Sequence, residues 1–473
     1  MCNGEIYNYK TLKKNVIYDF KSNSDCEVII PLYLKHGFKS MLKMLDGEYS
    51  IVLFDKKKGK TFAARDEIGI RPLFIGEKNT SIKYNKSKKK SKKSFFLTSE
   101  AKAIHEICDK IYQAKPGKFY TIENESLIEE EHSILWKNNK SKNLTLEEIT
   151  RKINLYLNDS VKKRLQADVP IGFLLSGGLD SSLVCSIASK NSLKKIRTFS
   201  VGIKDDPIDI HYAREVATFI GSDHQEYLFT KDELLDHLEE LIYYLETWDI
   251  TTIRASLGMS LICKYIKENT DIKVILTGEV SDELFGYKYT DYAPNAREFQ
   301  NEASKRISEL CYYDVLRADR CISKYGLEAR VPFSDKKFVK FIMDLKPELK
   351  MNHTGIGKYL LRKSFEKNYL PDHILYREKA AFSDAVGHSM VDYLIEYANK
   401  AISDESLKNA NQKYEYNTPF TKESLLYRNI FEKFYPSRSN LIPSYWMPNK
   451  NWKNCDVKDP SARILPNYGK SGS

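Results

Sequence analysis

Residues 174–182 read LLSGGLDSS, and the residues around them predict a buried strand on one side and a helix on the other. The apolar run IGFLL (171–175) is typical of the strand, and SSLVCSIASK (181–190) is typical of the helix. Two glycines after a strand allow a turn whose backbone N–H groups point inward and bind an anion. The N-terminus of the helix adds partial positive charge at the same place. The stretch therefore predicts a phosphate-binding loop.

The side chains of this loop favour an anion site over an ordinary turn, which SGG alone would also fit. Ser176, Ser181 and Ser182 add hydroxyl donors. The carboxylate of Asp180 would repel a bare phosphate, so we expect it to hold Mg²⁺ against the phosphate oxygens. No GxxxxGK[ST] motif is present, and GIGK at 355–358 lacks that spacing, which argues against a Walker-type loop.

The rest of the chain predicts two kinds of domain. From about residue 150, strand and helix patterns alternate, with further strands at 196–203 and 273–277, which indicates a parallel sheet covered by helices on both faces. The first 135 residues are instead β-rich. There, YSIVLFD (49–55) and KTFAARD (60–66) are joined by the turn KKKGK, which is typical of a hairpin.

The charge of the chain is concentrated in one tract. The formal net charge is +11, but residues 78–93 (KNTSIKYNKSKKKSKK) hold eight Lys and no acid. Such a composition buries too little apolar surface to fold, so we expect an inserted, solvated loop at a second hairpin turn. Because one tract carries the bias, no nucleic-acid partner is expected.

Composition also indicates the cellular compartment. Eight Cys are present and none forms a CxxC pair, which argues against a zinc site or a disulfide framework. No apolar run is long enough to span a bilayer, and the first residues do not resemble a secretory signal. The expectation is a cytosolic enzyme with no membrane partner.

The loop resembles the pyrophosphate loop of N-type ATP pyrophosphatases, which cleave ATP to AMP and pyrophosphate. Further segments resemble the successive signatures of the glutamine-hydrolysing asparagine synthetase family, and the resemblance covers nearly the whole chain. These segments are NGEIYNY (3–9), ETWDITTIRAS (246–256), TGEVSDELFGY (277–287), LRADRCISKYGLEARVPFSD (316–335), YREKAAFSD (376–384) and the tail from SYWMPNKNW (444–452).

The resemblance implies a fold and an activity. It implies an α+β N-terminal-nucleophile-type sandwich over 1–136, a linker over 137–150, and an α/β ATP pyrophosphatase domain over 151–473. The implied reaction adenylates the side-chain carboxylate of aspartate with ATP, after which ammonia, free or taken from glutamine, displaces AMP to give asparagine. Mg²⁺ is the implied metal ion, and the family also allows a homodimer.

The resemblance assigns roles to individual residues. In the synthetase reaction it implies Glu279, Lys379 and Arg254 as catalytic residues. It implies Asp282 and Glu283 as contacts of aspartate or the intermediate, with Asp180 and Asp282 sharing the metal ion. The implied ATP-binding residues are Leu175, Ser176, Gly177, Gly178, Asp180, Ser181, Val201, Thr277 and Gly278. The implied glutamine-binding residues are Asn3, Gly4, Glu5 and Asp25.

The sequence departs from the family pattern in two places. The family usually has Gly where Val280 stands, and a β-branched residue resists the positive φ that Gly permits. NGEIYN, which lies well inside the family's first domain, begins here at Asn3. We therefore expect the domain to lack its opening strands and nucleophile, Cys2 to be inert, and glutamine hydrolysis to be doubtful.

Two alternatives to asparagine synthesis remain at this point. One is a tRNA-modifying ATP pyrophosphatase, although such an enzyme would want catalytic Cys pairs. The other is a catalytically silent binding homologue, which the N-terminal departure and Val280 would suit. The joint presence of Asp180, Glu279, Asp282 and Lys379 argues against the silent homologue.

Overall fold

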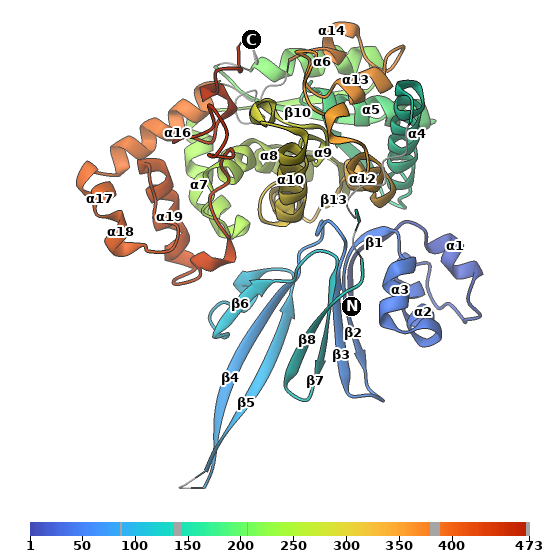
Figure 1. Ribbon diagram of the computed structural model, residues 1–473, viewed down its shortest axis with the longest axis vertical. Helices are drawn as coiled ribbons and strands as arrows, with labels where there is room; N and C mark the ends of the chain where they lie inside the picture. The colour runs from blue at the N-terminus through green and yellow to red at the C-terminus, as the bar shows by residue number, and fades with distance from the viewer. Residues whose placement is uncertain (86–87, 134, 137–143, 206, 379–387, 470–473) are drawn as a thin grey trace. The chain divides into compact units, whose positions relative to one another are not determined.

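The protein is described here by a computed structural model, and its described residues form two compact units, Met1–Leu135 and Trp136–Ser473 (Figure 1). Among the described residues, no helix is both long and apolar enough to cross a bilayer. The described ranges are 1–85, 88–133, 135–136, 144–205, 207–378 and 388–469.

The first unit is built on antiparallel strands. One sheet has the order β1-β2-β3-β7-β8 and a second has the order β5-β4-β6. The strands are β1 Cys2–Ile6, β2 Gly47–Asp55, β3 Lys60–Arg65, β4 Phe74–Asn85, β5 Lys88–Thr98, β6 Lys110–Gln113, β7 Lys118–Glu123 and β8 Ser126–Glu131. The helices are α1 Tyr9–Lys14, α2 Ile29–His36 and α3 Phe38–Met44, with the 3₁₀ turn η1 at Asp25–Val28.

The predicted hairpin is confirmed, since β2 and β3 pair antiparallel across the KKKGK turn. The prediction for the Lys tract is wrong. Backbone pairing between β4 and β5 continues from Phe74↔Thr98 out to Asn85↔Lys88, so the tract forms the outer part of a long ribbon rather than a loop (Figure 1). Composition predicted no buried core there, but a ribbon extends from an established ladder by backbone hydrogen bonds alone, which the side-chain pattern does not report.

The second unit contains a parallel sheet with the order β11-β10-β9-β12-β13. Its strands are β9 Ile171–Leu174, β10 Arg197–Ile203, β11 Asp223–Phe229, β12 Val274–Leu276 and β13 Glu328–Arg330. The helices up to the last strand are α4 Leu146–Arg164, α5 Leu179–Asn191, α6 Ile208–Ile220, α7 Lys231–Leu245, α8 Ile250–Asn269, α9 Ser281–Phe285, α10 Ala296–Glu309 and α11 Asp314–Ser323. The later helices are α12 Lys336–Met343, α13 Tyr359–Ser364, α14 Asp372–Leu375, α16 His388–Ala401, α17 Asp404–Lys408, α18 Ala410–Lys413 and α19 Lys422–Phe434.

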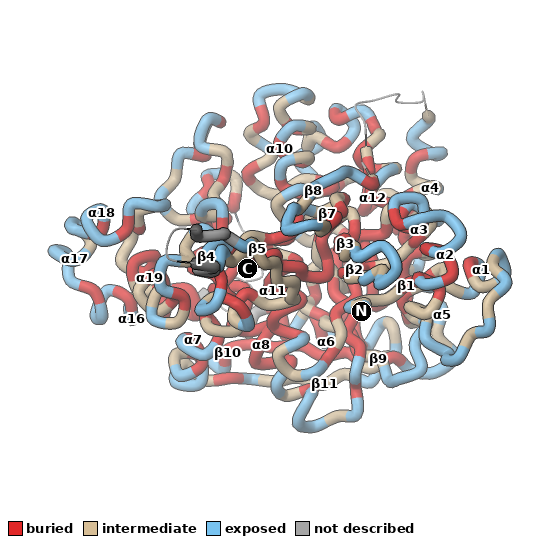
Figure 2. Tube along the Cα trace, turned by 90° about the horizontal axis from the view of Figure 1, so that it is seen from below, coloured by how far each residue is buried: buried red, intermediate tan, exposed pale blue. Residues whose placement is uncertain are grey.

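The predicted strands and helices around the glycine loop are confirmed, and α4 begins at Leu146, within the range predicted as a linker. Thr145 caps α4, its hydroxyl accepting the Glu148 N–H while Glu148 accepts the Thr145 N–H. Part of the predicted linker, 137–143, lies outside the described residues. In the second unit, Figure 2 shows many buried positions along β10 and α8. Phe199 of β10 and Ile253 of α8 are both at most 1% exposed.

The strand order determines where a ligand site forms. From β9 the chain builds outward on one side through β10 and β11, and later on the other side through β12 and β13. The strand order therefore reverses at β9, and crevices at the carboxyl ends of strands next to such a point are where α/β sheets bind ligands. The loops after Leu174 and Leu276 both leave the sheet at this edge because β9 and β12 are parallel neighbours.

Candidate active site

The loop after β9 has the compact geometry that its sequence indicated. Ser181 Oγ lies 3.1 Å from Ser176 Oγ and accepts the Ser176 N–H at 3.2 Å, which closes the loop onto the first turn of α5. Gly177 has φ +73°, and a Cβ added there would lie 2.5 Å from Cβ of Tyr212. Only glycine therefore fits at this bend, with α6 packed behind it.

A second loop, 277–280, lies directly against the first. A Cβ on Gly278 would come within 2.8 Å of the backbone nitrogen of Ser181, so the two loops touch through a glycine. Ser281, at the start of α9, then donates from its hydroxyl to Oδ1 of Asp180 at 2.7 Å. Two motifs about a hundred residues apart in sequence thus form one surface.

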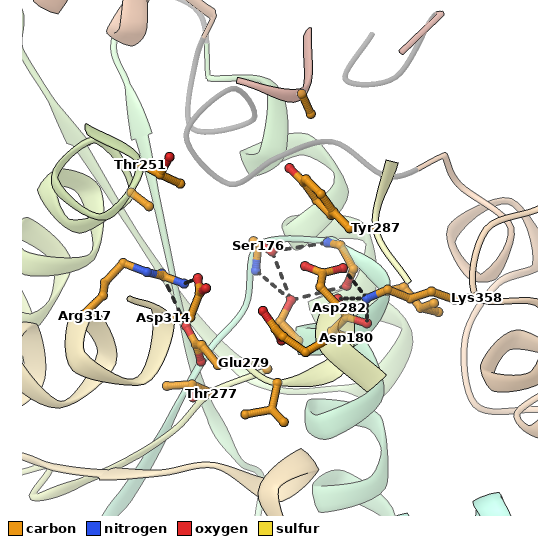
Figure 3. A pocket seen from close by; sticks show the side chains of 18 of the residues that line it. Ser176, Asp180, Thr251, Thr277, Glu279, Asp282, Tyr287, Asp314, Arg317 and Lys358 are labelled. Atoms are coloured by element: carbon orange, nitrogen blue, oxygen red, sulfur yellow. Dashed lines mark hydrogen bonds and ion pairs between the residues drawn. The ribbon is translucent and has the colours of Figure 1, made fainter. Parts of the chain in front are cut away.

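A buried lysine joins the two loops. Lys358 Nζ lies 2.8 Å from both carboxylate oxygens of Asp180 and 2.7 Å from Oδ1 of Asp282 (Figure 3). It also donates to the hydroxyl of Ser281 at 3.1 Å. The side chain of Lys358 is 3% exposed, so the ammonium is removed from water and is stabilised by these carboxylates.

These groups open onto a cavity of about 230 Å³. The cavity gathers most of the residues that the sequence singled out for the synthetase reaction. Those that line it are Leu175, Ser176, Gly178, Asp180, Ser181, Val201, Arg254, Thr277, Gly278, Glu279, Asp282 and Glu283. Of the other two, Gly177 lies in the loop itself, and Lys379 lies outside the described residues.

Glu279 lies at the wall of the cavity opposite a buried arginine. Its Oε1 is 3.4 Å from Nη1 of Arg317, whose Nη2 donates to Asp314 at 2.9 Å (Figure 3). Burial lowers the pKa of Arg317, but the charges of Glu279 and Asp314 outweigh burial and raise it above its usual value. Oε2 of Glu279 and Oγ1 of Thr277 are buried with no hydrogen-bond partner among the described residues. A ligand in the cavity would satisfy them.

The loop between these residues is strained. Val280 has φ +80° and ψ −17°, the left-handed conformation that its β-branched side chain disfavours, and it is 2% exposed. Val280 therefore adopts the positive φ that the family's glycine would permit. The bend at Val280 turns the chain from Glu279 into α9, so that Glu279 and Ser281 both reach the site.

Glu283 has an unusual electrostatic environment. Burial, followed by the nearby charges of Asp314 and Asp282, raises the pKa of the Glu283 carboxyl well above its usual value. Glu283 lies on α9, one residue beyond Asp282, where two adjacent carboxylates resist simultaneous ionisation. The neutral form of Glu283 is therefore favoured in this part of the cavity.

Arg254 on α8 lines the cavity, but its guanidinium is engaged elsewhere. It donates to Glu423 at 2.8 and 2.5 Å and to Asp459 at 3.0 and 2.8 Å. Burial lowers the pKa of Arg254, and the two carboxylates raise it well above its usual value. In this arrangement Arg254 ties α8 to the C-terminal region, and each of its three nitrogens donates to Glu423 or Asp459. Its catalytic role stays a prediction.

The first unit brings the predicted glutamine-binding residues together. Asn3, Gly4 and Glu5 lie on β1, and Oδ2 of Asp25 accepts the backbone N–H of Ile6 at 2.6 Å. Gly4 has φ +140°, and a Cβ there would clash with a backbone carbonyl of β2. This contact explains the glycine, while the role of the four residues stays a prediction.

Cys2 lies inside a paired strand. It is opposite Ile51 of β2, and its side chain packs against the core of the first unit. A hydrogen bond with Cys2, together with burial, raises the pKa of the neighbouring Cys26. This environment favours the protonated thiol of Cys26 over the nucleophilic thiolate.

Sequence reasoning missed three basic residues of the site, namely Lys358, Arg317 and Arg377. Arg377 donates to the carbonyl of Gly177 at 3.3 Å and to Asp209 at 3.1 Å, which braces the glycine loop. Each belongs to a segment that the sequence had already singled out, but only the fold shows which side chain turns inward. Lys358 in particular is the lysine of GIGK, whose spacing excluded a Walker loop without excluding a contact with phosphate.

Comparison with known proteins covers both units. A family model described as glutamine amidotransferase domain matches residues 1–147, and one described as asparagine synthase matches residues 152–309 and 292–458. The chain is 41% identical over 494 residues to a probable asparagine synthetase (glutamine-hydrolyzing) of Acanthamoeba polyphaga mimivirus, covering 98% of this chain and 86% of the relative. The chain belongs to the asparagine synthetase family. It is also 40% identical to the asparagine synthetase (glutamine-hydrolyzing) of Mus musculus over 491 residues, with the same coverage of both chains.

Family membership confirms the resemblance and the fold that it implied, an amidotransferase domain followed by a parallel-sheet domain of the ATP pyrophosphatase type. The comparisons do not favour either of the two alternatives, a tRNA-modifying enzyme or a silent homologue. They assign no residue of this chain a role, so the assignments of individual side chains rest on the geometry above.

Proposed function

We propose that the chain catalyses the ATP-dependent amidation of aspartate to asparagine through a β-aspartyl-AMP intermediate, releasing AMP and pyrophosphate. The observation that carries this proposal is the meeting of the two loops in one cavity. Asp180 and Asp282 come from separate strand ends and share the ammonium of Lys358 at 2.7–2.8 Å. A family member with this constellation at the carboxyl edge of its sheet has the parts that an ATP pyrophosphatase needs.

The glycine loop would bind the pyrophosphate portion of ATP. Its backbone N–H groups and the hydroxyls of Ser176 and Ser181 face the start of α5, where the helix dipole favours negative charge. Lys358 would then offset phosphate charge as pyrophosphate leaves. Leu175, Val201, Thr277 and Gly278 border the same cavity and would contact the nucleoside portion.

Asp180 and Asp282 suit Mg²⁺ as carboxylate ligands. Mg²⁺ in nucleotide sites binds one or two carboxylates and takes its other ligands from phosphates and water. The described residues contain no group of three or more His, Cys, Asp or Glu that would hold a metal alone, which fits a site completed by the nucleotide. When bound, Mg²⁺ would neutralise phosphate charge.

Glu279 would act in the second half-reaction. Its Oε2 is buried and without a hydrogen-bond partner among the described residues, while Arg317 stabilises Oε1. An ionised carboxylate held in this way would accept a proton from the attacking ammonia as the carbon–nitrogen bond forms and AMP departs. Glu283, with its raised pKa, would offer a neutral carboxyl to the same cavity. We keep Lys379 as a proposed transition-state cation on the family resemblance alone.

The nitrogen source, compartment and assembly are also part of the proposal, and family membership supports glutamine as a substrate. Asn3, Gly4, Glu5 and Asp25 would contact glutamine, Cys2 would take no part, and ammonia would support synthesis whether or not glutamine does. We propose a cytosolic protein that acts on small molecules and forms a homodimer.

Two variants separate the half-reactions and test the proposal. Asp180→Asn should reduce aspartate-dependent exchange of labelled pyrophosphate into ATP by roughly a hundredfold or more, because it removes a charge from the phosphate site. Glu279→Gln should retain much more of this exchange while losing asparagine formation. Asp236→Asn, an exposed acid on α7, is the matched control and should behave as wild type. Wild-type exchange in Asp180→Asn would refute the assignment of the site.

A further inference from the structure

Lys358 occupies the space between the two carboxylates proposed as metal ligands. Its ammonium contacts Asp180 Oδ1, Asp180 Oδ2 and Asp282 Oδ1 at 2.7–2.8 Å (Figure 3). A lysine in this position neutralises part of the charge that would attract a divalent cation. The structure therefore holds a cation of its own at the place where the metal would bind.

The position of Lys358 is built into the fold. Its backbone has φ +57°, an uncommon left-handed conformation for a residue other than glycine, directly before α13. The residue is 5% exposed, and a buried ammonium is costly unless it is paired. The hydroxyl of Ser281, which donates to Asp180 at 2.7 Å, lies 3.1 Å from the same ammonium. Backbone and partners thus aim this side chain between the carboxylates.

We propose that Lys358 keeps the metal position closed in the nucleotide-free enzyme and that metal and ATP enter together. The proposal rests on the proposed function, because it needs Asp180 and Asp282 to be the metal ligands. A divalent cation arriving alone would be repelled by the ammonium and attracted by carboxylates that are already paired. Arriving with ATP, it brings phosphate oxygens that coordinate the metal and attract the displaced ammonium.

The chemistry of lysine suits this exchange. Its ammonium is a compact charge on a flexible four-carbon stem, which can swing by a few ångströms from the carboxylates to a phosphate oxygen. An arginine fork held bidentately would be harder to displace. Lys358 is therefore a positioning residue that couples metal affinity to the presence of nucleotide.

A purely structural ion pair makes the opposite prediction for metal binding. If Lys358 only ties α13 to the loops, its removal lowers stability and leaves the affinity for a free metal ion unchanged. If Lys358 holds the metal position, its removal takes a positive charge away from the carboxylates of Asp180 and Asp282 and raises that affinity. Binding of the metal ion in the absence of nucleotide separates the two cases without any measurement of activity.

The probe is Mn²⁺, titrated into the purified chain without nucleotide and followed by the electron paramagnetic resonance signal of the free ion. Lys358→Met should bind Mn²⁺ at least tenfold more tightly than wild type. Mn²⁺ should also raise the Tm of this variant by more than it raises the Tm of wild type. Lys363→Met removes a partly exposed lysine of α13 paired with Glu366 and should match wild type. Adding the non-hydrolysable analogue α,β-methylene-ATP should bring wild type to bind Mn²⁺ tightly.

Lys358→Gln serves if the methionine variant does not fold, because it is also neutral and of similar reach. Equal Mn²⁺ affinity in wild type and in a folded neutral variant would overturn the inference. Tight binding of Mn²⁺ by wild type in the absence of nucleotide would also overturn it. A failure of the proposed function would give a different experimental result. In that case wild type would not take up Mn²⁺ even with the ATP analogue, and pyrophosphate exchange would be absent.

Discussion

Val280 offers a test of the strained loop that carries Glu279 into the site. Its φ of +80° places a buried, β-branched residue in the left-handed region. That region costs an L-residue roughly 1–2 kcal/mol, and glycine escapes this cost. Replacing Val280 by Ala keeps the penalty, whereas replacing it by Gly removes it. The Ala–Gly pair therefore isolates the strain.

Val315 provides the matched position. It is the second residue of α11 in the same unit and is 1% exposed, and its neighbours Asp314 and Leu316 are also in the helix. Inside a helix, Gly is less stable than Ala by about 1 kcal/mol. At position 280, relief of about 1–2 kcal/mol of strain should offset that disadvantage. Val280→Gly should thus be at least as stable as Val280→Ala, and the Ala–Gly differences at the two positions should differ by about 1–2 kcal/mol.

Urea unfolding of the four variants, followed by tryptophan fluorescence, measures these differences. Both positions lie in the second unit, so the same transition reports all four variants. The reasoning is refuted if glycine is as unfavourable relative to alanine at 280 as it is at 315. That result would mean that the positive φ at Val280 stores no strain.

Three further outcomes follow from the structure. Burial lowers the pKa of Lys350 to about 7 from 10.5, so the unfolded state binds more protons between these values and stability should rise with pH across that window. Lys350→Met should abolish this rise in a Tm-against-pH series. Replacing residues 78–93 by a short Gly/Ser turn should leave ammonia-dependent synthesis unchanged, because shortening the ribbon leaves the ladder nearest the sheet intact and loop length costs little; loss of activity would contradict this. Gly177→Ala, whose Cβ would meet Tyr212, should lower pyrophosphate exchange by roughly tenfold or more, and unchanged exchange would show that the loop tolerates the side chain.

The sequence predicted those features that local pattern controls. The strand before the glycine loop and the helix after it both follow from residues within a few positions of each other. The resemblance also indicated the positive φ at Val280. The family usually has Gly at this position, and the backbone conformation that Gly permits is kept with Val in its place.

Features that depend on distant contacts did not follow from pattern. Lys358 comes from a segment with no regular spacing, and only the fold brings its ammonium to Asp180, 178 residues away in sequence. Nothing in the sequence indicated that Glu423 and Asp459 would pair with the guanidinium of Arg254, whose predicted catalytic role stays a prediction. The Lys tract was predicted to be a loop because its composition shows that it cannot form a buried core. The ribbon forms instead by backbone pairing between β4 and β5, which composition does not reveal.

If aspartate is activated by adenylation, an oxygen of its side-chain carboxylate must leave with AMP, and an isotope label follows that oxygen. The purified chain is given ATP, Mg²⁺, an ammonium salt and aspartate labelled with ¹⁸O in the side-chain carboxylate. We expect AMP, pyrophosphate and asparagine in equal amounts, with one ¹⁸O in the phosphate of AMP. Formation of ADP and orthophosphate, or label in a phosphate other than that of AMP, would contradict it.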